Sequence, residues 1–157
     1  MSNLIEPKTF QNVLHDLLDE TFENHHGIYL DKHNGLIETL ELVSAEEASI
    51  PVGGKCASLA AQVAHVTFYI ESFERFALQG DTSPRDWSLI WRTVEKVTAE
   101  EWEEYKSKLK DAYHRMEKLF SDNSAWNEDT MGGALSIVVH TAYHLGEIRQ
   151  ALCVLKK

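Results

Sequence analysis

Two histidines lie four residues apart in an apolar segment near the end of the chain, VVHTAYHLGEIRQ (138–150). On an α-helix, His140 and His144 are separated by about 40° around the axis, so their imidazoles stack on one face. Glu147, one turn after His144, lies within about 20° of His140 in angle and so belongs to the same face. The residues at 133, 136 and 151, close to the same stripe, are small. This face therefore leaves room beside the imidazoles for a ligand or for solvent.

A third histidine, His65, lies in another apolar segment, AAQVAHVTFYIE (60–71), and its helical stripe is also mostly small or polar. Two such helices should pack with their polar stripes meeting inside the protein. Three imidazoles converging there would be unfavourable unless something accepts their lone pairs, which a divalent metal does. Three protein ligands with an open position are typical of catalytic zinc. The alternative, in which each is a core histidine satisfied by a hydrogen bond, stays open from spacing alone.

Three further residues lie near these histidines in sequence or in angle. Glu147 could accept the second ring N–H of a metal-bound imidazole, or it could form a salt bridge to a neighbouring helix. Tyr69 lies in angle beside His65 and could donate to a bound substrate, or it could pack as an amphipathic core residue. Gln62, one turn before His65, could line the same pocket. A metal held by neutral imidazoles lowers the pKa of bound water toward about 7 or stabilises a thiolate, so the ligands fit a hydrolase or a thiol transferase.

The composition limits the functional classes. The chain has 157 residues and a formal charge of −10. This suits one domain and, without a basic stripe, argues against binding to nucleic acid or to an anionic membrane. No apolar stretch reaches the roughly 20 residues that span a bilayer, and MSNLIEPKTF lacks the pattern of a secretory signal. Cys56 and Cys153 are far apart in apolar helical stretches, where burial is expected, and we expect a protein of the reducing cytoplasm.

Apolar residues at helical spacing predict an all-α protein. The expected helices cover residues of about 7–24, 34–43, 56–78, 99–120 and 133–155, the second being short. Gly27 is expected to mark the end of the first, and Thr98 with Glu101 forms a capping-box pattern before the fourth. The stretches 79–87 and 121–133 are expected to be loops. Four principal helices and one short helix predict a helical bundle of one domain over residues 1–157.

The other five histidines have simpler explanations. His25 and His26 are expected at the C-terminus of the first helix, where an imidazolium interacts favourably with the helix dipole. The remaining three histidines, His15, His33 and His114, are expected at or near the surface. The pairs Glu23–His26 and Asp111–His114 resemble fragments of a carboxylate-bridged dimetal bundle, but that architecture also needs a glutamate from each of two further helices.

The last expected helix carries a second apolar stripe, opposite its histidines. The members of this stripe are Val138, Ala142, Leu145 and Leu152. A helix that needs cover on both sides lies centrally in a bundle or at a subunit interface.

The segments SLAAQVAHVTFYIESF (58–73) and GGALSIVVHTAYHLGEIRQAL (132–152) resemble the DinB/YfiT-like superfamily of bacterial metal-binding four-helix bundles. The H-x-x-x-H pattern followed by LGEIRQ is the most specific part, and the likeness extends over nearly the whole chain in helix order and length. The resemblance implies an up-up-down-down bundle, usually a homodimer. It also implies that His65, His140 and His144 are the ligands of one divalent metal, and zinc and nickel both suit imidazole.

The resemblance further implies a relation to bacterial enzymes that use low-molecular-weight thiols such as bacillithiol or mycothiol. We therefore expect a metal-dependent transferase that conjugates such a thiol to an electrophile, with small molecules as its partners. Two alternatives use the same ligands: a metal-dependent hydrolase and a non-catalytic metal-binding stress-response protein. Family membership defines such a site better than it defines the substrate.

Overall fold

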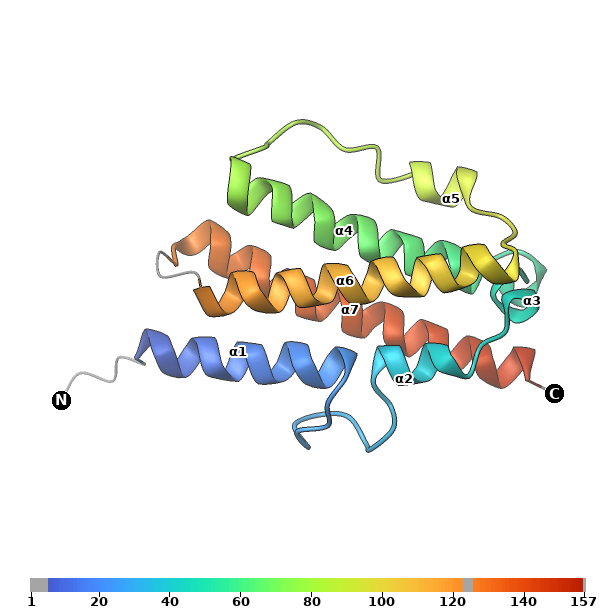
Figure 1. Cartoon of the computed structure of the whole chain (residues 1–157), viewed down its shortest axis with the longest axis horizontal. Coiled ribbons are helices and arrows are strands. Elements are labelled where there is room, and N and C mark those ends of the chain that lie inside the picture. The colour runs from blue at the N-terminus through green and yellow to red at the C-terminus, as the bar shows by residue number, and fades with distance from the viewer. Residues whose placement is uncertain (1–5, 123–125, 157) are drawn as a thin grey trace.

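Four long helices form the body of the molecule in the computed structural model, which describes residues 6–122 and 126–156 (Figure 1). These helices are α1 (Pro7–Phe22), α4 (Leu59–Gln79), α6 (Ala99–Asp122) and α7 (Glu128–Leu155). The shorter elements are α2 (Leu36–Glu41), α3 (Ala45–Ala48), the 3-10 turn η1 (Val52–Gly54) and α5 (Leu89–Thr93). No strand occurs in the described residues, which confirms the predicted all-α class. Within the same residues, no helix combines the length and apolar character needed to cross a bilayer.

The long helices pack in pairs, with α1 and α4 each contacting both α6 and α7. His15 of α1 pairs with Glu117, and Glu23, directly after α1, pairs with Lys110, so α1 and α6 are antiparallel. Helix α4 is likewise antiparallel to α7, while α4 and α6 run in the same direction (Figure 1). In chain order the long helices therefore run up, down, down and up. The up-up-down-down order expected from the resemblance is wrong.

The two long connections explain this order. After α1, the chain continues through α2 toward the far end of the molecule before α4 begins, so α4 returns antiparallel to α1 (Figure 1). After α4, the segment 80–98 crosses back along the outside of the molecule and carries α5. Helix α6 consequently starts at the same end as α4. Connections that cross the length of the molecule allow parallel neighbours, whereas short ones favour antiparallel neighbours.

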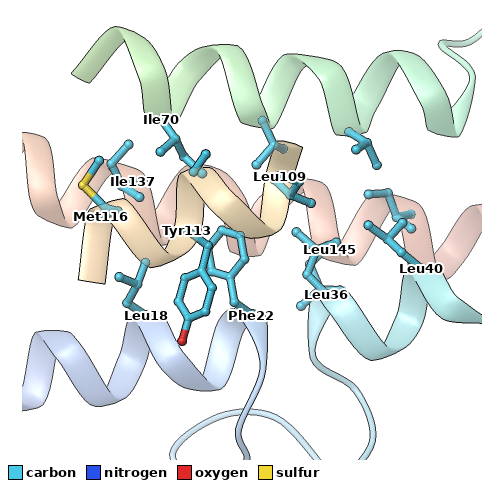
Figure 2. Close-up of a cluster of buried hydrophobic side chains, with 14 of the residues drawn as sticks. Leu18, Phe22, Leu36, Leu40, Ile70, Leu109, Tyr113, Met116, Ile137 and Leu145 are labelled. Atoms are coloured by element: carbon cyan, nitrogen blue, oxygen red, sulfur yellow. The ribbon is translucent and has the colours of Figure 1, made fainter. Parts of the chain in front are cut away.

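The core between the long helices consists of aliphatic side chains and a few aromatic rings (Figure 2). Phe22 of α1 stacks on Tyr113 of α6 with ring centroids 4.6 Å apart. Trp102, at the start of α6, donates its indole N–H to the carbonyl of Val43 at 2.8 Å. The buried aliphatic side chains between the helices include Leu18, Leu36, Ile70, Leu109, Ile137 and Leu145. This packing fixes the register of α4 and α7, which carry the three histidines.

Capping side chains determine where α6 and α7 begin, and the sequence predicted the first of these caps. The hydroxyl of Thr98 accepts from the N–H of Glu101, whose carboxylate accepts from the N–H of Thr98, as the capping box predicted. Helix α7 begins five residues earlier than expected, because Asn127 caps it and accepts from the N–H of Thr130. Of the loop expected at 121–133, residues 128–133 are thus helical, and 123–125 lie outside the described residues.

A buried carboxylate near the end of α1 organises the loop that follows. Glu20 is 1% exposed, and its oxygens accept from four backbone N–H groups, those of His26, Ile28, Tyr29 and Leu30. Burial alone would raise the pKa of Glu20, but these donors outweigh it and lower the pKa to about 2. The helix ends at Phe22, earlier than expected, and Gly27 lies within the loop.

A second buried carboxylate, Asp19, holds His26. Its oxygens accept from the hydroxyl of Tyr113 at 2.7 Å and from the amide of Asn24 at 2.9 Å, and Oδ2 lies 2.6 Å from Nε2 of His26. The hydrogen bond to Asp19 raises the pKa of His26, although burial opposes the change. The expectation that His26 acts on the helix dipole is therefore wrong, because the ring pairs with a side chain.

We expect the stabilising contribution of the His26–Asp19 pair to disappear as pH rises. Because the pKa of His26 is raised above its ordinary value of 6.5, the contribution is fully present below pH 6.5 and is lost as pH passes through the folded pKa. Urea unfolding of the wild type and of His26→Gln should show a stability difference below pH 6.5 that vanishes at alkaline pH. His25→Gln, at an exposed neighbour, should show no such pH dependence. An NMR titration that places the His26 pKa at or below 6.5 would contradict this prediction.

Helices α4 and α7 approach closely where Gly133 meets the ring of Phe73. A Cβ atom built at Gly133 would lie 1.9 Å from Cε2 of Phe73 and 2.6 Å from Cδ2. At the adjacent Gly132 a Cβ atom would have no neighbour within 4 Å. Packing against Phe73 therefore requires a glycine at position 133 but not at position 132.

Gly133→Ala is expected to destabilise the protein by about 1–3 kcal/mol, because the added methyl group overpacks the contact with Phe73. Gly132→Ala should instead stabilise it by about 0.5–1 kcal/mol, through the better helix propensity of alanine. Chemical unfolding of both variants gives the comparison, and adding Phe73→Leu to Gly133→Ala should recover part of the loss. Equal stability of the two alanine variants would show that the ring moves away freely.

The apolar stripe that suggested a subunit interface is largely used within the chain. Val138 and Leu145 are buried in the core, and Leu152 packs against it. This stripe is therefore covered by the protein's own helices and no longer argues for a dimer. The large apolar side chains that α7 exposes lie on another stripe, which includes Leu135, Val139 and Tyr143.

Candidate metal centre

The structure brings His65 of α4 together with His140 and His144 of α7. One ring nitrogen of each histidine lies within 4.8 Å of the others, and the Nε2 atoms of His65 and His140 are 3.1 Å apart. The antiparallel crossing of the two helices causes this meeting, since His65 faces the turn of α7 that carries both other rings. The polar stripes predicted from sequence therefore do meet inside the protein.

The spacing of the ring nitrogens fits a metal ion. Zinc–nitrogen bonds of about 2.0–2.1 Å place two ligand nitrogens about 3.3 Å apart at a tetrahedral angle and about 2.9 Å apart at a right angle. The 3.1 Å between the Nε2 atoms of His65 and His140 lies between these values. Two neutral imidazoles also meet at this distance through a single N–H···N hydrogen bond, but the third ring then has no role at the centre.

The surroundings keep all three imidazoles neutral. Burial, with a smaller contribution from the neighbouring His144, lowers the pKa of His65 and of His140, each to about 4, although Glu147 slightly opposes the change at His65. Burial also lowers the pKa of His144, against the opposing influence of Glu147. Neutral rings keep the lone pair with which imidazole binds a divalent metal.

The second nitrogen of each ring shows which histidine is held in place. Nδ1 of His144 lies 3.0 Å from Oε2 of Glu147 and 3.2 Å from Oε1 of Gln62. Both partners are acceptors, so the proton belongs on Nδ1, which leaves the lone pair on Nε2. By contrast, Nδ1 of His65 and of His140 is buried and has no hydrogen-bond partner in residues 6–122 and 126–156. Glu147 thus makes the ring contact proposed for it, and Gln62, expected only to line the pocket, contacts the same histidine.

Glu147 acts within its own helix. Its other carboxylate oxygen accepts from the hydroxyl of Tyr143 at 2.6 Å, which raises the pKa of Tyr143. In the described part of the chain, Glu147 makes no salt bridge to a neighbouring helix, so that alternative is not observed.

Two aromatic rings lie against the cluster. Tyr69 stacks on His140 with ring centroids 3.9 Å apart and planes at 17°, whereas its angle on α4 had placed it beside His65. Trp91 of α5 lies 4.3 Å from His65 and 6.3 Å from His144, measured between ring centroids. Sequence reasoning missed Trp91, because a five-residue helix is too short to show a hydrophobic period. Its spacing of four residues from Trp87 is the signal that could have revealed it.

The dimetal alternative finds no support in the described residues, where the His65 cluster is the only group of three or more side chains that could hold a metal. Glu23 pairs with Lys110 at 2.9 Å, and His114 lies 3.1 Å from Glu117. Glu23 and His114, and also His26 through its contact with Asp19, therefore have other partners.

The two cysteines differ from expectation. Cys56 and Cys153 are both exposed and unpaired, although burial was predicted for both. Cys56 lies before α4 begins rather than within it, and Cys153 points outward from the last turn of α7. Neither belongs to the histidine cluster.

Comparison of the chain with protein-family models, with curated protein sequences and with solved structures finds no match in any of the three.

Proposed function

We propose that this protein is a metal-dependent transferase of the DinB/YfiT-like type, which conjugates a low-molecular-weight thiol such as bacillithiol to an electrophile. The observation that carries the proposal is the convergence of three neutral imidazoles, with the Nε2 atoms of His65 and His140 only 3.1 Å apart. The proposed ligands are these two residues and His144, holding one divalent ion, zinc or nickel. A four-helix bundle of the DinB/YfiT-like type, a homodimer and a cytoplasmic location belong to the same proposal, the last supported by the unpaired cysteines.

The roles of the chain's own residues follow from their contacts. Glu147 and Gln62 hold the Nδ1 proton of His144, so that its Nε2 lone pair is available. Tyr69 and Trp91 cover the rings of His140 and His65 and restrict the access of water. A bound divalent metal would supply a thiolate at neutral pH by lowering the pKa of the thiol. The thiol sulfur then forms a bond to an electrophilic carbon, the bond to the leaving group breaks, and the thiol proton is released to solvent.

The test uses monochlorobimane, which forms a fluorescent thioether and releases chloride when a thiol attacks it. Zinc- or nickel-loaded protein should accelerate its conjugation to a bacillithiol-type thiol, and His140→Ala should not. Unchanged acceleration by verified metal-free protein would refute the proposal. Metal-dependent turnover of esters without thiol conjugation would assign a hydrolase instead, and tight metal binding without any turnover would assign a non-catalytic metal-binding protein.

A further inference from the structure

A cavity of about 260 Å³ adjoins the histidine cluster and shares one wall with it. That wall is Tyr69, which lines the cavity and stacks on His140. The cavity lies between the second half of α4, the segment that follows it, and Ser136, which is one turn before His140 on α7. A molecule bound in it would therefore lie one aromatic ring away from the proposed metal ligands.

Two buried polar atoms of this cavity have no hydrogen-bond partner among the residues that the structure describes. The hydroxyl of Ser72, in a residue only 7% exposed, makes no hydrogen bond, and neither does Nε of Arg85. The other donors of Arg85 are in use: Nη2 pairs with Asp81 at 2.7 Å, and Nη1 donates to the carbonyl of Ser83 at 2.7 Å. Buried polar groups are nearly always hydrogen-bonded, so two unpartnered atoms in one cavity point to a ligand with an oxygen acceptor.

Aromatic rings form one part of the lining, and polar residues that include Asp81, Thr82, Ser83 and Ser136 form the other. Phe73, Phe76 and Trp87 line the cavity together with Tyr69. Trp87 packs on Tyr69 with ring centroids 5.6 Å apart, and Phe73 packs on Phe76 at 6.3 Å. Aromatic faces and edges favour a flat apolar partner. An engineered cavity of about 150 Å³ holds benzene, so the volume here suits a ring with a short substituent.

We infer that this cavity binds an aromatic carbonyl compound, whose ring packs against Phe73 and Trp87 and whose oxygen accepts from Arg85 and Ser72. The ion pair with Asp81 already balances the charge of Arg85, so a neutral carbonyl suits the site better than a carboxylate.

The inference deepens the proposed function, on which it rests for the role of the compound as the electrophile. A carbonyl conjugated to a carbon–carbon double bond accepts a thiol without a leaving group or an oxidant. The new sulfur–carbon bond forms at the β-carbon, the double-bond electrons move toward the carbonyl oxygen, and the thiol proton ends on the α-carbon. Donors at the carbonyl oxygen stabilise the negative charge that develops there.

Binding is tested with acetophenone, titrated into the full-length protein in its metal-free and zinc-loaded forms. The ¹⁵N–¹H signal of the Trp87 indole should shift and saturate, with a Kd on the order of 1 mM for so small a ligand. The indole of Trp102, buried at the start of α6 and bonded to Val43, should not shift. Toluene, which lacks the oxygen, should bind at least several-fold more weakly.

A matched pair of arginine variants tests the contact. Arg85→Met should weaken acetophenone binding by about tenfold, as expected for the loss of a hydrogen bond to a charged donor. Arg92→Met should leave it unchanged, because Arg92 forms a similar ion pair with Asp86 in the same segment but does not line the cavity. Equal effects of the two variants, a silent Trp87 signal, or toluene binding as tightly as acetophenone would each overturn the inference.

Cobalt-loaded protein separates this inference from the proposed function. Paramagnetic cobalt should broaden the proton signals of bound acetophenone relative to the zinc-loaded form, if the cavity adjoins the metal. Acetophenone that binds equally well to a protein with no affinity for any metal would support the cavity and refute the proposed function. If the protein binds metal and conjugates a thiol to monochlorobimane but does not bind acetophenone, the proposed function is supported and the inference about the cavity is refuted.

Discussion

His144→Ala is expected to abolish tight zinc binding while leaving the metal-free protein folded. His144 is the histidine whose ring is fixed by Glu147 and Gln62, so its loss removes the best-oriented ligand. Changes to residues that only orient a ligand typically reduce metal affinity by about 10–100-fold, so loss of the ligand itself should exceed that range. Competition with a chromophoric chelator measures the affinity. Zinc at a concentration of about 100 Kd should also stabilise the wild type by about 2.7 kcal/mol and the variant not at all.

The matched control is His114→Ala, which removes an exposed imidazole whose partner is Glu117 on the same helix. It should bind zinc as the wild type does. His140→Ala provides a second test at a less buried ligand, in case the change at position 144 disturbs the core. Zinc affinity and zinc-dependent stabilisation that survive in both ligand variants would contradict the metal centre.

Helical periodicity was sufficient to predict the histidine cluster from sequence. Residues four apart on a helix share a face, and a polar stripe on an apolar helix must meet another polar group when the helix is buried. His65, His140 and His144 satisfied both conditions, so their meeting followed without knowledge of the topology. Periodicity does not reveal which neighbouring helix a side chain meets. The position of Tyr69 on its helix was therefore predictable, but its stacking on His140 of the neighbouring helix was not.

Features that depend on the path of the connections could not be predicted in this way. The direction of α4 and α6 depends on how the segments 23–58 and 80–98 cross the molecule, and their sequences contain no long-range period. Trp91 reaches the histidines only because the second of these segments returns along α4. The cavity beside Tyr69 is lined by the same segment, so the sequence did not indicate it.

The role of the buried carboxylate of Glu20 likewise could not be predicted from the sequence, because its partners are backbone N–H groups, which every residue except proline carries. We expect Glu20→Ala to destabilise the protein by about 3 kcal/mol, since four donors, those of His26, Ile28, Tyr29 and Leu30, lose their acceptor together. The loop from 23 to 35, rather than the histidine cluster, should lose its order. Urea unfolding measures the first effect, and amide hydrogen exchange at residues 26–30 measures the second.

Two further variants show whether the acceptor or the helix position is responsible. Glu20→Gln keeps the size and one acceptor oxygen, so its destabilisation should be smaller than that of Glu20→Ala. Glu23→Ala removes a carboxylate one turn later whose surface ion pair with Lys110 should contribute only about 0–1 kcal/mol. If Glu20→Ala is no more destabilising than Glu23→Ala, the loop is held by its apolar contacts and the backbone donors are satisfied by water. If the exchange of residues 26–30 does accelerate and the zinc affinity stays unchanged, the Glu20 site and the histidine cluster are energetically independent.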